Sequence, residues 1–523
     1  MSRSVPNQES SPAPHPLGRG IVIGLPAAVA LAYALGHLNW YLTTPLGRVP
    51  VLDERENIDM AEAIFGGTLP SLPFYRAPGY ALVLSGLRLA GVSQGGLFAS
   101  ALALGALLHG LGAALTAGLA LRWFGRRAAL AAGLLFALDP VLVHHATQAL
   151  DSTLSMVLFL AGLNCFAAAI DVPSRTGPWV GAGVFWAAAT LVRPNYLPVW
   201  LLVPAFAWAL SRGWRQRARV LPAALSGVLL FGAEAAWQKR ICGVAGFLPW
   251  QGAYNLWSAN RPGANGRYFA QLVSLPDALA RANPARAESI YLYAKVTQGK
   301  PPDIASMNAY WRGRFLEEVA GHPVRWAGLM ARKVYALLNN WEQYNNTTYA
   351  FHKALSPWLS WNPLCWGLLL VLAVPGAARL LARSPRSAAA LAAVSLACAA
   401  SILLFYVSGR FRLPLAAVCT VLAGGGLEGW SSIGAGSPRR RAALAGAMAL
   451  AAFAAFSWFG GVEDRSTFVQ DHALLARAAF TVGDDETALR EAREARKLQP
   501  WHPDARIIED AAAAELARRG AHP

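Results

Sequence analysis

Long apolar runs set the strongest limit on what this chain can fold into. A helix that crosses a bilayer needs about 20 mainly apolar residues, and it satisfies its own backbone polar groups. On that criterion the sequence predicts eleven spanning helices. They are expected at residues 20–42, 97–121, 128–147, 151–170, 178–193, 196–211, 220–237, 363–382, 387–407, 413–430 and 441–460. The predicted fold class is therefore an all-α polytopic membrane protein.

Composition agrees with this interpretation. Only 14% of the residues are charged, whereas a soluble domain carries about 25%. The net charge is +17, but the basic residues cluster in short loops between apolar runs, which indicates membrane topology rather than nucleic-acid binding. The five cysteines form no Cys-x-x-Cys pair, so neither a disulfide framework nor a zinc site is expected.

The basic loops predict an orientation in the membrane. Four of them, at residues 122–127, 211–217, 379–386 and 438–441, fall on the side of the N-terminus if there are eleven spans. The positive-inside rule makes that side the cytoplasm. We therefore expect a multi-pass plasma (inner) membrane protein with its C-terminus outside, in the periplasm. The outer loops at residues 43–95 and 240–360 then share one face with the C-terminal tail.

Three domains are predicted. Residues 1–19 read as a disordered cytoplasmic N-terminus, residues 20–462 as the membrane domain and residues 463–523 as a helical tail. Within the outer loops, residues 57–65, 80–89 and 324–338 have the spacing of helices that lie along the membrane surface.

The tail shows the spacing of a tetratricopeptide repeat. The positions that fit this pattern are Leu475, Ala476, Ala479, Gly483, Ala488, Ala495 and Pro500. One and a half such repeats cannot bury a continuous core alone. We therefore expect the tail to pack on the outer loops or on a protein partner.

An acidic cluster follows the first apolar run. It contains Asp53, Glu54, Glu56, Asp59 and Glu62. A carboxylate in a partly dry pocket at the membrane surface would have a raised pKa and could act as a general base. Asp53 and Glu54 are the candidates for this role, whereas the other three carboxylates are expected to form a solvated helix face.

Four arginines are candidates for binding an anionic group. Arg76 lies in an aromatic segment, and its guanidinium suits a phosphate. Arg193 ends a predicted span, where a phosphate or the carboxylate of Asp151 would be its partner. Arg410 and Arg412 open another span on the outer side, against the positive-inside trend. That exception favours an anionic headgroup there.

Residues 250–266 mix asparagine, glycine and aromatic residues without helical or strand periodicity. Such a loop offers amide donors and stacking surfaces that suit a sugar, and Asn255 and Asn260 are the candidate contacts. His144 and His145 have no carboxylate at metal-ligand spacing. No cofactor is therefore predicted, and a divalent cation is left open.

These motifs, in this order, resemble the GT-C class of polytopic glycosyltransferases. The nearest group is the bacterial relatives of protein O-mannosyltransferase and of the aminoarabinose transferase that acts on lipid A. The resemblance covers about residues 20–430. It rests on Asp53-Glu54, Tyr75 to Pro78, Asp139-Pro140 with Asp151, Arg193-Pro194-Asn195, Asn255 to Gly266, and Arg410-x-Arg412-x-Pro414. The chain departs from the family pattern at Asn57 and at Ala77-Pro78-Gly79.

The resemblance implies an inverting transfer of a sugar from a polyprenyl-phosphate donor to an acceptor hydroxyl at the outer face. Asp53 would be the base, and Glu54 would support it. Arg76, Arg193, Arg410 and Arg412 would hold the donor phosphate. Tyr75, Asp151, Asn255 and Asn260 would contact substrate, and the acceptor would be a lipid, a glycan or a protein.

Two other classes stay open at this point. A transporter or lipid flippase would also be polytopic, although the sequence shows no convincing internal repeat. A catalytically inactive scaffold that presents the tail to partners is the third reading.

Overall fold

The computed structural model describes residues 18–276, apart from 212, 214–216 and 219, together with residues 283–298, 303–429 and 437–520. Within this part every regular element is a helix, and one isolated bridge joins Asn345 to Thr347. The predicted disorder of residues 1–19 lies almost wholly outside the described residues, as does most of the basic loop at 211–217.

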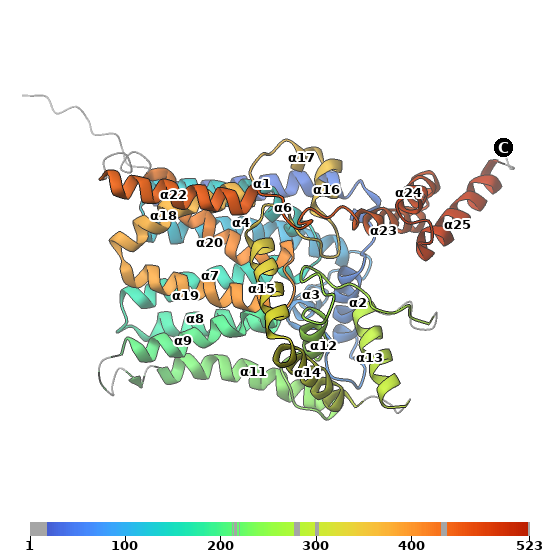
Figure 1. Cartoon of the computed structure of the whole chain (residues 1–523), viewed down its shortest axis with the longest axis horizontal. Coiled ribbons are helices and arrows are strands. Elements are labelled where there is room, and N and C mark those ends of the chain that lie inside the picture. Colours follow the sequence, from blue (N-terminus) through green and yellow to red (C-terminus); the bar gives the residue numbers. More distant parts are fainter. Residues whose placement is uncertain are drawn as a thin grey trace, which may run out of the picture.

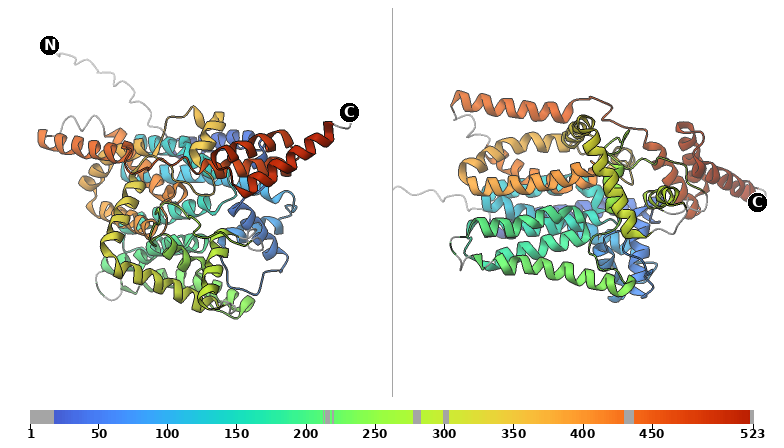
Figure 2. Two further views of the ribbon diagram at one scale, coloured as in Figure 1. Left: turned by 45° about the vertical axis from the view of Figure 1, so that its right-hand side comes forward. Right: turned by 60° about the horizontal axis from the view of Figure 1, so that its bottom comes forward.

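Long helices that run nearly parallel form most of the molecule (Figure 1). They are α1 (Arg19–Tyr41), α4 (Leu97–Trp123), α5 (Arg126–Leu138), α7 (Asp151–Asp171), α8 (Thr176–Val192), α9 (Leu197–Ala209), α11 (Val220–Cys242), α18 (Trp366–Arg383), α19 (Pro385–Leu404), α20 (Gly409–Glu428) and α22 (Pro438–Phe456). The same helices lie side by side in two further views (Figure 2). Small residues allow close packing: a Cβ on Gly376 of α18 would overlap the carbonyl of Leu422 in α20.

Seven of these helices are long and apolar enough to cross a membrane, namely α1, α4, α7, α11, α18, α19 and α20. An eighth span is present if α5 and α6 (Pro140–Ala146) are taken together, although they meet at an angle of 57°. The bend arises because Pro140 cannot donate a helical hydrogen bond, while the Asp139 carboxylate caps the new helix by accepting from the Val141 amide at 2.9 Å.

The three remaining predicted spans are also helical but fail the same test. The helices α8 and α9 have only 17 and 13 residues, and α22 begins with three arginines, Arg439 to Arg441. By length and composition the described residues thus support seven or eight spans, fewer than the eleven predicted. The predicted spans 178–193 and 196–211 are separate helices: α8 ends at Val192 and the short helix η2 (Pro194–Tyr196) follows, because a proline at position 194 disfavours a continuous helix.

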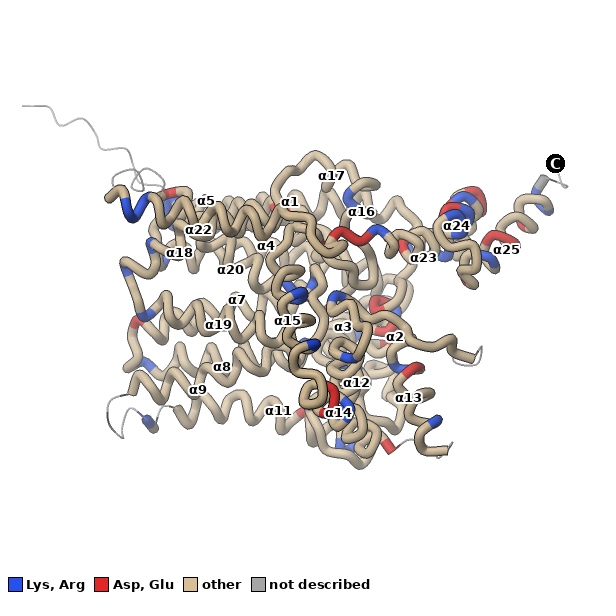
Figure 3. Tube along the Cα trace, in the orientation of Figure 1, with Lys and Arg blue, Asp and Glu red and all other residues tan. Residues whose placement is uncertain are grey.

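Shorter helices gather at one end of the bundle, which we call the polar end (Figure 1). They are η1 (Pro45–Gly47), α2 (Asp53–Phe65), α3 (Gly79–Leu89), α12 (Gln251–Ser258), α13 (Pro284–Val296), α14 (Ile304–Gly321), α15 (Pro323–Leu338), α16 (Tyr349–Leu355) and α17 (Pro357–Ser360). The surface helices predicted at 57–65, 80–89 and 324–338 correspond to α2, α3 and α15. The described basic residues of the predicted loops lie at the opposite end of the bundle (Figure 3).

One prediction for the polar end is wrong. The segment 250–266 was expected to be aperiodic, yet its first half forms α12. This helix is stabilised by tertiary packing, since Tyr254 is buried against Trp311 with ring centroids 4.8 Å apart. Short helices of this kind depend on such contacts more than on local propensity.

The C-terminal tail folds into three helices, α23 (Phe468–Thr481), α24 (Asp485–Leu498) and α25 (Pro503–Gly520). Only α23 is embedded in the polar end, where the buried Asp471 carboxylate accepts from the Thr348 amide at 2.8 Å. The other two helices project away from the bundle (Figure 1). The tail therefore packs on the outer segments through one helix, and its assignment as a tetratricopeptide repeat stays a prediction.

Candidate active site

The site begins with a strained turn directly before Asp53. Leu52 has a φ of 48° and a ψ of −122°, a conformation that β-turns of type II′ usually give to glycine. The turn closes through the Glu54 amide, which donates to the Val51 carbonyl at 3.0 Å. Such outliers cost of the order of 1–3 kcal/mol and persist only where surrounding contacts impose them. Here the turn places Asp53 at the first position of α2.

Asp53 is buried between two guanidinium groups. Its Oδ1 accepts from Arg76 Nη2, and its Oδ2 accepts from Arg410 Nη2 at 2.9 Å. Burial alone would raise the pKa of Asp53, but Arg76 and Arg410 outweigh it and hold this pKa well below its usual range. The prediction of a raised pKa for Asp53 is therefore wrong, because the sequence could not show that two cations converge on one carboxylate.

Arg76 also binds a second carboxylate. Its Nε donates to Glu56, so one guanidinium joins Asp53 and Glu56 across the start of α2. Burial and the neighbouring Asp53 raise the pKa of Glu56, although Arg76 opposes this shift. Glu56 had been assigned to a solvated helix face, yet it belongs to the site. Its spacing of three residues from Asp53, on the same face of a helix, was the available signal.

We call Asp53, Glu56, Arg76 and Arg410 the charged cluster. Arg193 lies beside it: its Nη1 donates to the Arg410 carbonyl at 3.3 Å. The buried Nε of Arg410 has no hydrogen-bond partner among the described residues. The cluster thus holds at least one donor that is free to bind an anion.

Arg193 pairs with Asp151, as one of the two predicted alternatives stated. The distance between Arg193 Nη2 and Asp151 Oδ1 is 3.3 Å, and the guanidinium stacks over the ring of Phe411 at 4.5 Å. A small hollow lies beside it and is lined mainly by apolar groups of η2, α19 and α20. Arg193 therefore contributes a cation to the edge of an apolar hollow.

Glu54 has a different position from Asp53. Its Oε1 accepts from the Ala149 amide at 3.0 Å, and its Oε2 accepts from the Val51 amide at 3.2 Å. Asn57 donates to the Ala149 carbonyl at 3.1 Å, so α2 hydrogen-bonds to both backbone polar groups of Ala149. Burial raises the pKa of Glu54 to about 7, although the two amides lower it. With both oxygens engaged by backbone, Glu54 positions the turn and has no free oxygen for substrate.

Arg412 is placed away from the charged cluster. It donates to Glu342 and to the carbonyls of Leu337 and Asn339, and its guanidinium lies 4.9 Å from the Trp366 ring. Arg410 and Arg412 are two residues apart on a helix, so their side chains leave in different directions. The geometry thus gives Arg412 a role in joining α20 to the segment after α15.

The residues predicted to contact substrate also lie at different distances from the charged cluster. Tyr75 lies near the cluster, donates to Asn283 at 3.2 Å and packs edge-on against Trp250. Asn255 lies on α12 and is partly exposed.

Asn260 is fully occupied. Its amide nitrogen donates to the carbonyls of Leu256 and Leu404, and its Oδ1 accepts from Trp326 at 3.2 Å and Lys333 at 3.1 Å. An asparagine side chain can donate two hydrogen bonds and accept two. The structure therefore leaves Asn260 no hydrogen bond for a sugar, and gives it the role of a buried anchor.

A divalent cation has no evident ligand set. Among the described residues no group of three or more His, Cys, Asp or Glu side chains is arranged to hold a metal ion. The carboxylates of the charged cluster already face arginines.

The comparisons with known proteins find structural similarity alone. No family model matches the sequence, and no curated protein matches it. The apo oligosaccharyltransferase of Archaeoglobus fulgidus has a TM-score of 0.47 and 13% identity, covering 86% of this chain and 57% of that one. ArnT from Cupriavidus metallidurans bound to undecaprenyl phosphate has a TM-score of 0.33 and 18% identity, covering 80% of each chain.

This chain thus spans somewhat more than half the length of the archaeal enzyme that it resembles. The archaeal oligosaccharyltransferase AglB from Archaeoglobus fulgidus, in complex with an inhibitory peptide and a dolichol-phosphate, has a TM-score of 0.43 and 14% identity, covering 87% of this chain and 57% of that one. These similarities to membrane glycosyltransferases are distant, and they assign neither family membership nor a function.

Proposed function

We propose that this chain is an integral membrane glycosyltransferase. It would move a sugar from a polyprenyl-phosphate donor to an acceptor hydroxyl, with inversion at the anomeric carbon. The observation that carries this proposal is the buried, anionic Asp53 between Arg76 and Arg410 at the polar end of an apolar helix bundle. A carboxylate that stays deprotonated can accept the proton of a hydroxyl, and the guanidiniums beside it suit a phosphate.

The ion pairs suggest how the base is activated. In the resting state both Asp53 oxygens are bound by guanidiniums, which makes this carboxylate a weak base. A donor phosphate would compete with Asp53 for Arg410, whose Nε has no hydrogen-bond partner in the part of the chain that the structure describes. Loss of that partner raises the pKa of Asp53 only once the donor is bound. Asp53 then takes the acceptor proton as the hydroxyl oxygen attacks the anomeric carbon, and the polyprenyl phosphate leaves.

The surroundings of Arg193 support a lipid-linked donor. The small hollow beside Arg193 is lined mainly by apolar groups of η2, α19 and α20, so in this proposal a prenyl chain would meet an apolar surface beside the cation. With basic loops at the far end of the bundle, the positive-inside rule would place the polar end outside the cytoplasm (Figure 3). In this proposal Arg76, Arg193 and Arg410 hold the donor phosphate, whereas Arg412 and Glu54 support the structure.

The test is transfer of a radiolabelled sugar from its polyprenyl phosphate by the purified chain. Asp53→Asn should lower the rate by about 10²–10⁴-fold, the range of general-base catalysis. The matched control is Asp59→Asn, which changes an exposed carboxylate on the same helix and should transfer normally. Undiminished transfer by Asp53→Asn would remove Asp53 as the base. Movement of the lipid across proteoliposomes without turnover would instead favour a flippase.

A further inference from the structure

The segment that joins the membrane helices to the tail has no role in the proposal above. We call residues 461–471 the strap; it contains the connection from α22 to α23 and the first turn of α23 (Figure 1). Gly460 and Gly461 precede and open it, with φ of 61° and 65°, a left-handed conformation that glycine adopts without a steric cost. These two glycines let the chain change direction after α22 ends.

An arginine and a tyrosine from the segment after α12 hold the first half of the strap. Arg267 Nη1 donates to the carbonyls of Gly461 and Val462 at 2.8 and 3.2 Å. Arg267 Nη2 lies 3.2 Å from Asp464 Oδ2, and the Tyr268 hydroxyl donates to the same oxygen at 2.6 Å. The side chains of Arg267 and Asp464 are only 18% and 15% exposed. Salt therefore screens this ion pair less than a pair on the open surface.

The second half of the strap contacts a buried segment, residues 342–348, which we call the inner segment. The Thr348 amide donates to Asp471 Oδ1 at 2.8 Å. The Thr348 hydroxyl lies 2.8 Å from the Thr467 hydroxyl. All three side chains are buried, and the loss of one partner would leave a buried polar group unsatisfied, which is costly. These contacts therefore fix the end of the inner segment against the strap.

Gln343 of the inner segment joins the strap to α20. Its side-chain amide donates to the Val462 carbonyl at 3.1 Å. Its backbone carbonyl accepts from the amide of Gly409, the first residue of α20, at 3.0 Å. Beside it, Asn345 Nδ2 donates to the Ser408 hydroxyl at 3.2 Å. The strap is thus connected to the start of α20 through two successive hydrogen bonds.

The start of α20 is the part of that helix that carries Arg410. The first amides of a helix have no partner within it, so the first turn depends on contacts from outside. The fit here is close, because a Cβ on Gly409 would lie 2.6 Å from Glu342 Oε2. Arg410 follows Gly409 directly, and its Nη2 donates to Asp53 Oδ2 at 2.9 Å. A shift of the inner segment would therefore displace a guanidinium of the charged cluster.

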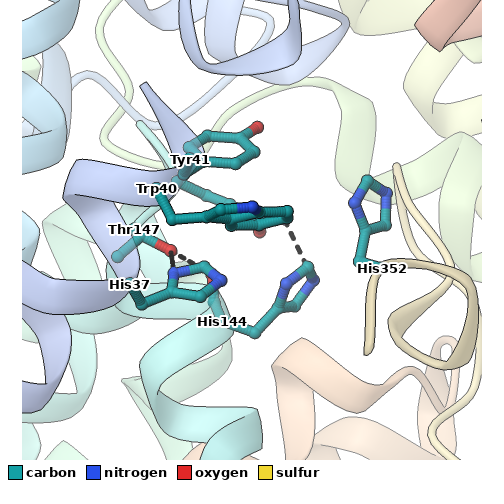
Figure 4. A pocket seen from close by; sticks show the side chains of 7 residues that line it. His37, Trp40, Tyr41, His144, Thr147 and His352 are labelled. Carbon is teal, nitrogen blue, oxygen red and sulfur yellow. Dashed lines mark hydrogen bonds between the residues drawn. The ribbon is translucent and has the colours of Figure 1, made fainter. Parts of the chain in front are cut away.

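The end of the strap also reaches the buried histidines of the polar end. Figure 4 shows the rings of His37, His144 and His352 around the side chain of Trp40. These residues come from α1, α6 and α16, and Asp471 Oδ1 lies 3.4 Å from His352 Nε2. The ring of His352 is 5.3 Å from that of His144, between centroids. The end of the strap is therefore packed against helices of the bundle.

We propose that the strap positions Arg410 for the phosphate of the donor, with Asp471 and Thr467 as positioning residues. This inference rests on the proposed transferase function. Asp471 and Thr467 hold Thr348, the inner segment holds the start of α20, and Arg410 then faces Asp53. The tail is needed at the active site through the strap, whereas α24 and α25 project away from the bundle (Figure 1).

The test is the binding of undecaprenyl phosphate, used as the probe, to the purified full-length chain, titrated by native mass spectrometry. Asp471→Ala removes the acceptor of the Thr348 amide, so the Kd should rise by about tenfold, as expected for the loss of one buried hydrogen bond. Asp471→Asn keeps an oxygen at this position and should restore most of the affinity. Asp510→Ala is the matched control, because Asp510 is exposed on α25.

A second pair of variants tests the same contact if Asp471→Ala fails to fold. Thr467→Val replaces the hydroxyl with a methyl group of similar size and should raise the Kd about threefold. Thr467→Ser keeps the hydroxyl and should bind like the wild type. Thermal unfolding measures the folding of each variant. Partial unfolding lowers the amount of lipid bound at saturation, whereas displacement of Arg410 raises the Kd, so the titration curves distinguish the two causes.

Two outcomes would overturn the inference: unchanged Kd values in Asp471→Ala and Thr467→Val, or an equal loss of affinity in Asp471→Ala and Asp471→Asn. Binding and transfer are measured separately, so failure here is distinguishable from failure of the transferase proposal. If Asp53→Asn abolishes transfer while Asp471→Ala binds the lipid normally, the transferase stands and the strap has no positioning role. If Asp471→Ala alone weakens binding while Asp53→Asn transfers normally, the strap positions Arg410 and Asp53 is not the base.

Discussion

The charged cluster and the buried histidines His37, His144 and His352 lie at the same end of one bundle but have opposite electrostatic surroundings. In the cluster, Asp53 is bound on both oxygens by guanidiniums, and every carboxylate meets a cation. Around these histidines, buried imidazoles meet hydroxyl and amide groups. An anionic ligand can replace a carboxylate as the partner of an arginine, whereas neutral groups select a ligand by the geometry of its hydrogen bonds.

The element between the two sites explains how they stay separate. Glu54 and Asn57 hydrogen-bond to the backbone of Ala149. The same loop carries Thr147 and Gln148, which lie beside the histidines. Glu54 also accepts from the Val51 amide, and this hydrogen bond fixes the turn that places Asp53 in the charged cluster. The division between an anionic and a neutral site therefore depends on one buried carboxylate.

The largest effect should come from weakening the cluster alone. Arg410→Met removes one of the two cations on Asp53, together with the unpaired donor assigned to the phosphate. Transfer should fall by about 10²–10³-fold, as when a donor to a developing charge is lost, with a higher KM for the donor. Rates measured against donor concentration check this, and Arg55→Met on the exposed face of α2 is the control.

A smaller effect, on the free energy of unfolding, should come from Glu54, and it depends on pH. The pKa of Glu54 is raised by burial to about 7, from 4.5. The folded state therefore binds more protons than the unfolded state between these values, so stability is present at low pH and is lost as pH rises to about 7. Within that window the loss approaches about 1.4 kcal/mol per pH unit.

Glu54→Gln should remove this part of the slope. Thermal unfolding of the wild type and the variant between pH 4.5 and pH 7 measures the difference, with Asp59→Asn as the reference. Parallel curves for Glu54→Gln and wild type would mean that Glu54 keeps its charge when folded, held by the amides of Val51 and Ala149.

The smallest effect is expected at the strained turn. Leu52→Gly relieves a positive φ, and stability should rise by up to about 1 kcal/mol, because the flexibility of glycine in the unfolded chain offsets part of the gain. Transfer should fall a few-fold as Asp53 becomes less firmly placed. Gln298→Gly is the matched control, since Gln298 has a φ of 54° away from the site. A stabilised Leu52→Gly variant with full activity would show that the strained conformation of Leu52 is not needed for transfer.

Much of the local structure was readable from the sequence. Every segment predicted to span is helical, and α2, α3 and α15 appear where amphipathic spacing indicated them. The break at Arg193-Pro194 followed from proline chemistry. Eleven spans were predicted, and by length and composition the described residues include seven helices that could cross a membrane, or eight with the bent pair α5 and α6. The helices α8 and α9 are short and α22 carries three arginines near its start, so these further spans stay predictions.

The partners of each polar residue were much less predictable. Arg410 and Arg412 looked equivalent, yet one reaches Asp53 and the other is saturated by Glu342 and two carbonyls. Asn260 looked like a sugar contact, but it is occupied by four hydrogen bonds from distant segments. Glu56 looked solvated, but Arg76 reaches it across the start of α2.

Period, length and hydropathy are local properties, so the amino-acid sequence was sufficient to predict an all-helical, apolar chain with its acidic and aromatic motifs in loops. Which charges neutralise one another became evident from the folded chain alone. The ion pair between Asp53 and Arg410 joins residues that are 357 positions apart in the sequence. Ion pairing and desolvation depend on distances across the fold, and these set the pKa of Asp53 in the opposite direction to the one expected from its loop alone.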